Sequence, residues 1–276
     1  MLKYFFLLLS TLFTILIEHF TNLTFSNDWY FLALIFIGLY ILVTAFYFVV
    51  IYLISLTINT KKEYTRTTFF HKWILDQTIQ LLCELGRVKI KVINKELVPN
   101  NEKYLLVYNH KSNFDPMIES VVLKKHNLIH ISKSGNFKIP IAGPFIRRNC
   151  YLEINRDDPR KAITTINKAA DFISSGYASI GVSPEGTRNK GDGLLPFKPG
   201  CFKIAFKSKC PIVVCSFRNT EKIHKNFPLK RTKVIMKVLK VIEYSEYSEM
   251  TTIEIAEMTE KIIADDLNIT INRGDN

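Results

Sequence analysis

The sequence predicts an α/β domain with about seven strands in a mostly parallel or mixed sheet flanked by helices, preceded by a membrane-embedded helical segment. Two observations predict this fold. From about residue 86 onward, short apolar runs bounded by turn residues alternate with amphipathic stretches, as is typical of strands buried between helices. The first 57 residues are almost uncharged and largely apolar. We therefore expect residues 1–60 in the membrane and a single domain over residues 61–276.

The amino-terminal segment contains two apolar runs. Residues 29–57 are apolar almost throughout and exceed the roughly 20 residues that a spanning helix requires. Residues 4–17 form a shorter run, so either a hairpin or a helix at the membrane surface fits it. The loop between the runs lacks Lys and Arg, whereas "KKEYTRTTFFHK" follows the second run closely. This asymmetry predicts that the rest of the chain lies on the cytoplasmic side.

The elements of the domain follow from local patterns. Asp158 and Pro159 are typical of a helix start, an apolar stripe runs from Ala162 to Ile173, and Gly176 is typical of a helix end. We expect further helices over residues 116–125, 199–208 and 249–266, and strands over residues 88–93, 104–108, 128–132, 150–154, 178–183, 211–217 and 233–243.

Charge is concentrated in the domain. The chain carries a net charge of +12, yet its first 57 residues hold only Lys3, Glu18 and Asp28. Such a basic domain fits an anionic membrane surface or a phosphorylated small molecule. A nucleic-acid-binding role rests on charge alone and leaves the apolar segment unexplained. The five cysteines show no metal-ligand or disulfide spacing, which favours free thiols.

A polar turn after the strand at 104–108 carries a histidine and an aspartate. The stretch reads "YLLVYNHKSNFDP", so His110 lies at a strand's carboxyl end, where functional residues gather in α/β sheets. A neutral histidine there can accept a proton from an attacking hydroxyl, and Asp115 would orient the ring. Asp115 also precedes Pro116 and a helical pattern, as an N-cap does. These residues alone leave both roles open.

A second polar stretch, "SPEGTRNKGDG", follows the strand at 178–183 and should face the same crevice. Gly186 allows close approach of the backbone to a ligand, and Thr187 and Arg188 suit a phosphate. The alternative is a solvated loop in which Glu185 pairs with Arg188. Basic residues between the two stretches would extend a phosphate site if they flank one crevice: Lys133, Lys138, Arg147, Arg148 and Arg156.

These stretches resemble the signature blocks of the glycerolipid acyltransferases, the family of the 1-acylglycerol-3-phosphate acyltransferases. "NHKSNFD", from Asn109 to Asp115, matches their NHxxxxD block, and "PEGTR", from Pro184 to Arg188, matches their second block. The segment "KSGNFKIPIAGPFIRRNCYLEINRDD" is similar to the block between them, and "LLPFKPGCFKIA" and "CPIVVCSF" are similar to the segments that follow. The resemblance covers roughly residues 85–220. The resemblance is specific because both motifs occur in this order.

The resemblance implies a membrane-bound acyltransferase that moves a fatty acyl group from acyl-CoA or acyl-carrier protein to the sn-2 hydroxyl of lysophosphatidic acid. It implies His110 as the base and Asp115 as its partner, without a metal or cofactor. The partners it implies are a membrane lipid acceptor, the acyl donor and an anionic membrane surface, and not nucleic acid. The implied glycerophosphate site consists of Glu185, Gly186, Thr187 and Arg188, with Arg156 as a further phosphate contact and Lys133 as an oxyanion or phosphate contact.

The choice of acceptor stays open. Ser183, Asn189 and Val214 differ from the residues that are usual at these places in the family. An acyltransferase for another lysophospholipid, or for a hydroxylated or aminated lipid, is the nearest alternative. A non-catalytic membrane lipid-binding scaffold is a different one, although a scaffold has no need to keep His110 and Asp115.

Overall fold

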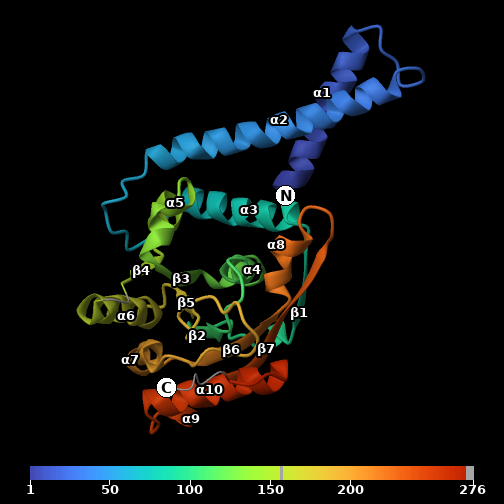
Figure 1. Ribbon diagram of the computed structural model, residues 1–276. Coiled ribbons are helices and arrows are strands. Elements are labelled where there is room, and N and C mark those ends of the chain that lie inside the picture. The colour runs from blue at the N-terminus through green and yellow to red at the C-terminus, as the bar shows by residue number, and fades with distance from the viewer. Residues whose placement is uncertain (156–157, 272–276) are drawn as a thin grey trace.

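A computed structural model describes residues 1–155 and 158–271 and shows a seven-stranded sheet (Figure 1). The strand order is β1-β7-β6-β2-β5-β3-β4. The five strands from β6 to β4 are parallel, whereas β7 is antiparallel to β6 and parallel to β1. The predicted mostly parallel, mixed sheet is confirmed. The strands are β1 (Val88–Ile93), β2 (Leu105–Tyr108), β3 (Leu128–Lys133), β4 (Leu152–Ile154), β5 (Ser179–Val182), β6 (Ile212–Arg218) and β7 (Thr232–Ile242).

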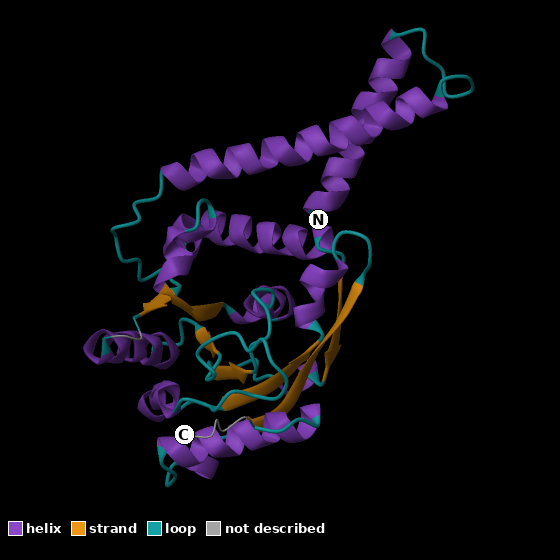
Figure 2. Ribbon diagram, viewed as in Figure 1, coloured by secondary structure: helices purple, strands orange, loops and turns teal. Residues whose placement is uncertain are grey.

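Helices cover both faces of the sheet and give three layers (Figure 2). Successive side chains of β2 face opposite layers, as the pleat of a strand requires. Leu105 and Val107 pack in one core with α6, α7 and α10, whereas Leu106 and Tyr108 pack in the other with α3 and α4. The domain helices are α3 (Phe69–Leu85), α4 (Asp115–Val122), α5 (Ala142–Arg148), α6 (Pro159–Ser174), α7 (Lys203–Ser208), α8 (Ile223–Asn226), α9 (Tyr244–Tyr247) and α10 (Thr252–Leu267).

The ends of the expected strands and helices lie within three residues of the observed ends, except that the helix expected from residue 199 begins with a 3-10 turn (Pro199–Phe202) before α7. The short helices α5, α8 and α9 were not expected, and neither was α3. Its sequence does carry helix signals. Thr68 is the N-cap and accepts a hydrogen bond from the backbone N–H of His71. Leu75 and Ile79 lie one turn apart on one face and pack in one apolar cluster with Ile51 of the second apolar helix. The helix is therefore buried between α4 and the sheet on one side and the amino-terminal segment on the other.

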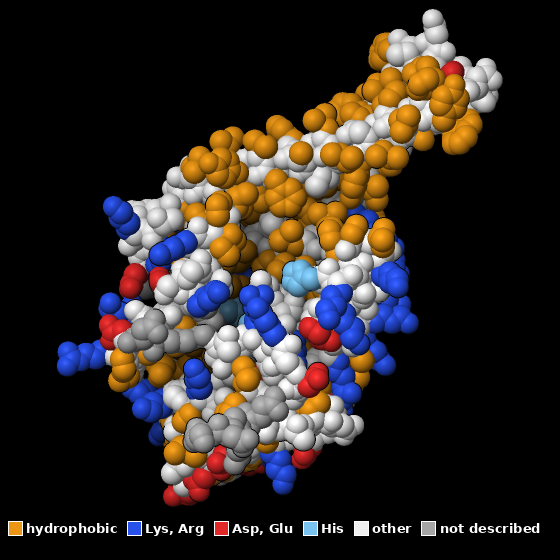
Figure 3. Space-filling model, viewed as in Figure 1, with side chains coloured by type: hydrophobic (Ala, Val, Ile, Leu, Met, Phe, Trp, Pro, Cys, Tyr) orange, Lys and Arg blue, Asp and Glu red, His pale blue; other side chains and the backbone are white. Residues whose placement is uncertain are grey.

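The amino-terminal segment forms two apolar helices, α1 (Leu2–Phe20) and α2 (Trp29–Leu56). Both are long and apolar enough to cross a membrane. Only 22% of the most apolar window of α1 and 6% of that of α2 is buried within the protein, so neither is a core helix. Their apolar side chains cover the surface of the projecting part of the molecule (Figure 3). Together these features indicate association with a membrane.

The second apolar helix is joined to the domain through α3. The Tyr47 hydroxyl and Thr78 Oγ1 are 2.7 Å apart and share a hydrogen bond between α2 and α3. Ile51 and Ile58 of the amino-terminal segment pack in one apolar cluster with Leu75 of α3 and Phe145 of α5. The membrane segment therefore shares a core with the helices that surround the candidate site.

Candidate active site

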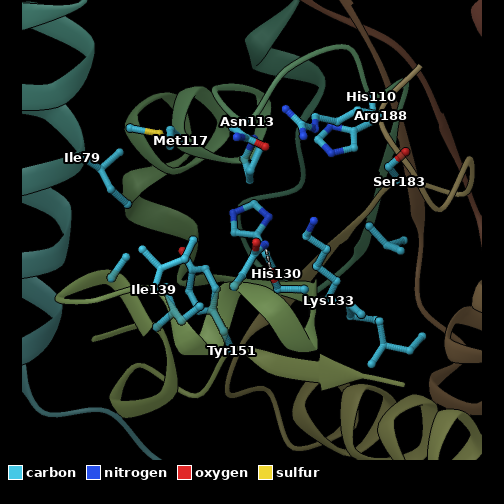
Figure 4. Close-up of a pocket in the computed structure, with 18 of the residues that line it drawn as sticks. Ile79, His110, Asn113, Met117, His130, Lys133, Ile139, Tyr151, Ser183 and Arg188 are labelled. Atoms are coloured by element: carbon cyan, nitrogen blue, oxygen red, sulfur yellow. Dashed lines mark hydrogen bonds between the residues drawn. The ribbon is translucent and has the colours of Figure 1, made fainter. Parts of the chain in front are cut away.

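The carboxyl ends of β2, β5 and β3 open onto one cavity of about 720 Å³. These three strands are neighbours and run parallel, so their following loops meet at the same edge of the sheet. The turn after β2 supplies His110, the turn after β5 supplies Arg188, and β3 ends at Lys133. Figure 4 shows these three side chains on one side of the cavity. The structure thus brings together the two stretches that the sequence placed in one crevice.

His110 and Asp115 form a hydrogen-bonded pair. His110 Nδ1 lies 2.8 Å from Asp115 Oδ2, and Asp115 is fully buried while the histidine side chain is 21% exposed. An ionised carboxylate only accepts hydrogen bonds, so Nδ1 carries the proton. The lone pair of Nε2 is then left to act as a base.

Asp115 is held by the turn that precedes it. Its Oδ2 also accepts hydrogen bonds from the backbone N–H groups of Lys111 and Ser112, each at 2.8 Å. The N-cap of α4 is Phe114, and no side-chain cap bond is formed. The expectation that Asp115 also caps the helix is therefore wrong, because its carboxylate folds back onto the histidine turn.

Glu185 links the PEGTR stretch to the histidine turn. Its Oε1 accepts a hydrogen bond from the backbone N–H of His110 at 2.6 Å, and its Oε2 accepts one from Leu195 at 3.1 Å. The backbone N–H of Asn189 donates in turn to the His110 carbonyl at 2.8 Å. Glu185 is buried, and this burial raises its pKa. The structure places Glu185 behind the cavity wall, where it supports the backbone that carries the base.

The remaining PEGTR residues line the cavity. Thr187 and Arg188 are exposed there, and Gly186 has a φ of +72°. A Cβ added at Gly186 would lie 3.3 Å from three side-chain atoms of Lys198, so this lysine lies directly over the glycine. Lys198 also lines the cavity. It was not singled out from the sequence, although the block "LLPFKPGCFKIA" contains it.

The other basic residues expected near the site fall into two groups. Lys133 lines the cavity, whereas Arg156 lies outside the described residues. Arg147 pairs with Glu153 at 2.7 Å, and Arg148 donates to the backbone carbonyl of Arg66 at 3.1 Å. These two arginines therefore support the α5 region.

The cavity is apolar at its other end. Ile79, Met117 and Ile139 lie on the side away from His110 and Arg188 (Figure 4). Further apolar lining comes from α2, α3 and α5, through Phe48, Ile51, Leu75 and Phe145. One end of the cavity is thus cationic and carries the base, and the other reaches the apolar helices. Among the described residues, no cluster of three or more His, Cys, Asp or Glu side chains could hold a metal ion.

A family model described as "Acyltransferase" matches residues 89–218, the segment that contains both motifs and the three strand ends. This part of the chain, somewhat less than half of its length, is therefore similar to the acyltransferase family.

The chain is similar to several 1-acyl-sn-glycerol-3-phosphate acyltransferases. That of Salmonella typhimurium is 30% identical over 146 residues, which are 52% of this chain and 59% of the relative. That of Haemophilus influenzae is 33% identical over 125 residues, which are 43% of this chain and 52% of the relative. The chain spans about half the length of these relatives. The structure also aligns with a crystal structure of the 1-acyl-sn-glycerophosphate acyltransferase from Thermotoga maritima. The alignment covers 71% of this chain and 80% of the Thermotoga chain, with a TM-score of 0.56 and 21% sequence identity. The two proteins share the same fold.

A second pair of ionisable residues lies beside the candidate site. His130 lines the cavity, and its Nδ1 is 3.4 Å from Oε2 of the fully buried Glu119. Burial, reinforced by the charge of Asp115, raises the pKa of Glu119 well above its usual range, and burial lowers that of His130 to about 3. Both shifts favour the neutral form of the side chain. Gly181 leaves room for them, because a Cβ there would lie 2.7 Å from His130 Nδ1.

Proposed function

We propose that this chain is a membrane-bound acyltransferase that transfers a fatty acyl group from acyl-CoA or acyl-carrier protein to the sn-2 hydroxyl of lysophosphatidic acid, producing phosphatidic acid. One observation carries the proposal: the His110–Asp115 pair lies in a cavity that is cationic at one end and apolar at the other. A lysophosphatidic acid has the same division, with a phosphate at one end and a hydrocarbon chain at the other. The names of the relatives support this acceptor.

The chemistry follows from the tautomer of His110. Its Nε2 removes the proton of the acceptor hydroxyl as that oxygen attacks the thioester carbonyl carbon. The oxygen–carbon bond forms, the tetrahedral intermediate collapses, and the carbon–sulfur bond breaks. The imidazolium then returns its proton to the departing thiolate. Asp115, ionised and buried 2.8 Å from Nδ1, stabilises the positive ring through this cycle.

The acceptor phosphate is proposed to bind at the cationic end. Arg188 offers two parallel donors to phosphate oxygens, and Lys198 lies beside the exposed backbone of Gly186. Thr187 adds a hydroxyl donor and Lys133 a further cation on the cavity wall. This arrangement would hold the glycerol hydroxyl toward His110.

The acyl chains are proposed to occupy the apolar end, which α2, α3 and α5 enclose. Because α2 is one of the membrane helices, a lipid chain would reach this end from the bilayer without crossing water. The basic stretch that follows α2 supports a cytoplasmic position for the domain, where acyl-CoA and acyl-carrier protein are available.

The test is acyl transfer from a radiolabelled acyl-CoA to oleoyl-lysophosphatidic acid in liposomes, with wild type compared with His110→Ala. We expect labelled phosphatidic acid from wild type and a loss of at least ~100-fold in the variant, as for a general base. Equal rates would refute the role of His110. A panel of other lysophospholipids run in parallel identifies the acceptor, and a folded wild type inactive on every one of them would refute the proposed reaction.

A further inference from the structure

The last two residues of α8 and the connection to β7, together residues 225–231, carry two strongly exposed apolar side chains. Phe227 is 54% exposed and Leu229 is 83% exposed. Single exposed apolar residues are common on protein surfaces, but these two lie at one loop tip and are flanked by cations. Lys225, Lys230 and Arg231 are all exposed, and the loop sequence KNFPLKR contains no acidic residue.

The loop is fixed on the side of the domain that faces the apolar helices. Arg87, which follows α3, donates from Nη1 to the carbonyl oxygens of Pro228 and Leu229, at 3.2 Å each. Its own carbonyl accepts a hydrogen bond from the N–H of Thr232 at 3.1 Å. The loop is therefore anchored to Arg87, which follows α3, both at its middle and at its β7 end.

That end of α3 lies directly below the membrane segment. Leu85 lines a shallow apolar hollow together with Tyr40 and Ile41 of α2. Figure 1 shows the α8–β7 loop beside the chain's amino terminus and the end of α3. A bilayer that surrounds α1 and α2 would therefore approach the tip of this loop.

We propose that residues 225–231 are a second membrane contact of this protein, with an anionic lipid surface as the partner. Phe227 and Leu229 enter the boundary between headgroups and acyl chains, as apolar side chains of interfacial segments do. Lys225, Lys230 and Arg231 remain at the level of the lipid phosphates. Each well-placed cation contributes about a five-fold gain in affinity for an anionic surface.

Continuity with the membrane helices favours lipid over a protein partner. The apolar tip is small and ringed by like charges, whereas a stable protein interface needs about 800 Å² on each partner. With α1 and α2 as one attachment, the loop supplies a second, and two attachments fix the tilt of the domain on the bilayer. The inference rests on membrane association and is independent of the proposed reaction.

The test places a fluorescent label on the loop of the full chain. Four of the five cysteines are buried and Cys201 is partly exposed, so bimane is attached to Leu229→Cys in a Cys201→Ser background. The matched control is Ile253→Cys, an apolar residue that is 59% exposed on α10, at the opposite end of the molecule from α1 and α2 (Figure 1). Both proteins are bound to vesicles of phosphatidylcholine and phosphatidylglycerol that contain a nitroxide-labelled lipid chain.

We expect the label at position 229 to shift its emission to the blue and to be quenched by the nitroxide lipid, while the label at 253 changes in neither respect. Aqueous emission and no quenching at 229 in vesicle-bound protein would overturn the proposal. Replacement of Lys225, Lys230 and Arg231 by Gln should lower the quenching at 229 to the level seen in vesicles without phosphatidylglycerol. Undiminished quenching would overturn the assignment of an anionic partner.

Discussion

Replacing Asp115 by Asn tests whether the charge of this residue supports the base. All three hydrogen bonds accepted by Asp115 go to one oxygen, Oδ2. An asparagine keeps a carbonyl oxygen at that position, so the Lys111 and Ser112 amides and His110 Nδ1 keep their acceptor. The change removes the negative charge and leaves the shape of the turn intact.

The structure predicts different effects of this substitution on the reaction rate and on the stability of the protein. The other carboxylate oxygen, Oδ1, is buried and has no hydrogen-bond partner among the described residues, so the asparagine NH₂ group would lack an acceptor there, at a cost of about 1–3 kcal/mol. Loss of the charge beside the imidazolium should lower kcat by roughly 100- to 10,000-fold. Asp115→Ala should destabilise the protein more, because two backbone N–H groups lose their acceptor.

The assay pairs initial rates of acyl transfer to oleoyl-lysophosphatidic acid with thermal unfolding of the same preparations. Asp115→Asn should stay folded and lose activity, whereas Asp115→Ala should lose both. An Asn variant with near-wild-type kcat would refute the argument that Asp115 stabilises the charged ring, and would leave it only a structural role in the turn.

Four further predictions follow from single contacts. Gly181→Ala should destabilise the domain by about 1–3 kcal/mol in thermal unfolding, because the new Cβ would lie 2.7 Å from the buried His130 Nδ1. The control is Gly200→Ala, which should not destabilise the domain because its Cβ would meet nothing within 4 Å. The folded protein raises the pKa of Glu119 above its ordinary value, so the stability that the protonated carboxyl contributes is complete below the unfolded-state pKa and is lost as the pH rises toward the folded-state pKa. The stability of Glu119→Gln relative to wild type should therefore rise from about pH 5 to 8, and a fall would contradict the raised pKa of Glu119. Lys198→Gln should raise KM for lysophosphatidic acid about tenfold or more, and a change confined to kcat would argue against a phosphate contact. Ile79→Trp should shift the acyl preference toward shorter acyl chains in a competition assay. An unchanged preference would indicate that the acyl chain binds elsewhere.

The sheet and its crevice were predictable because their signals are local. Short apolar runs mark buried strands, and parallel strands must direct their following loops to one edge. The sequence therefore placed His110 and Arg188 together before any contact was known. The helix α3 was missed because its apolar residues point to two sides, toward α4 and the sheet and toward α2, so that no single apolar stripe stands out in the sequence.

Within the site, the sequence predicts residue types better than the direction in which each side chain points. Glu185 belongs to a ligand-binding motif by resemblance, yet both of its carboxylate oxygens accept hydrogen bonds from backbone N–H groups. His130 and Glu119 sit in segments that are apolar on average, and they meet only because Gly181 of the neighbouring strand leaves space. Such pairs depend on packing between strands, which single-sequence patterns do not encode.

The link from Glu185 to the His110 backbone means that the two motifs cannot be dissected independently. A substitution at Glu185 would move the base as well as the phosphate loop, so its effect on KM and kcat would be mixed. A double-mutant cycle between Glu185 and His110 should show strong non-additivity, as residues in one hydrogen-bonded network do. If the proposed function is correct, the two sequence motifs act as one cooperative unit, in which the wall of the binding site also sets the position of the reacting nitrogen.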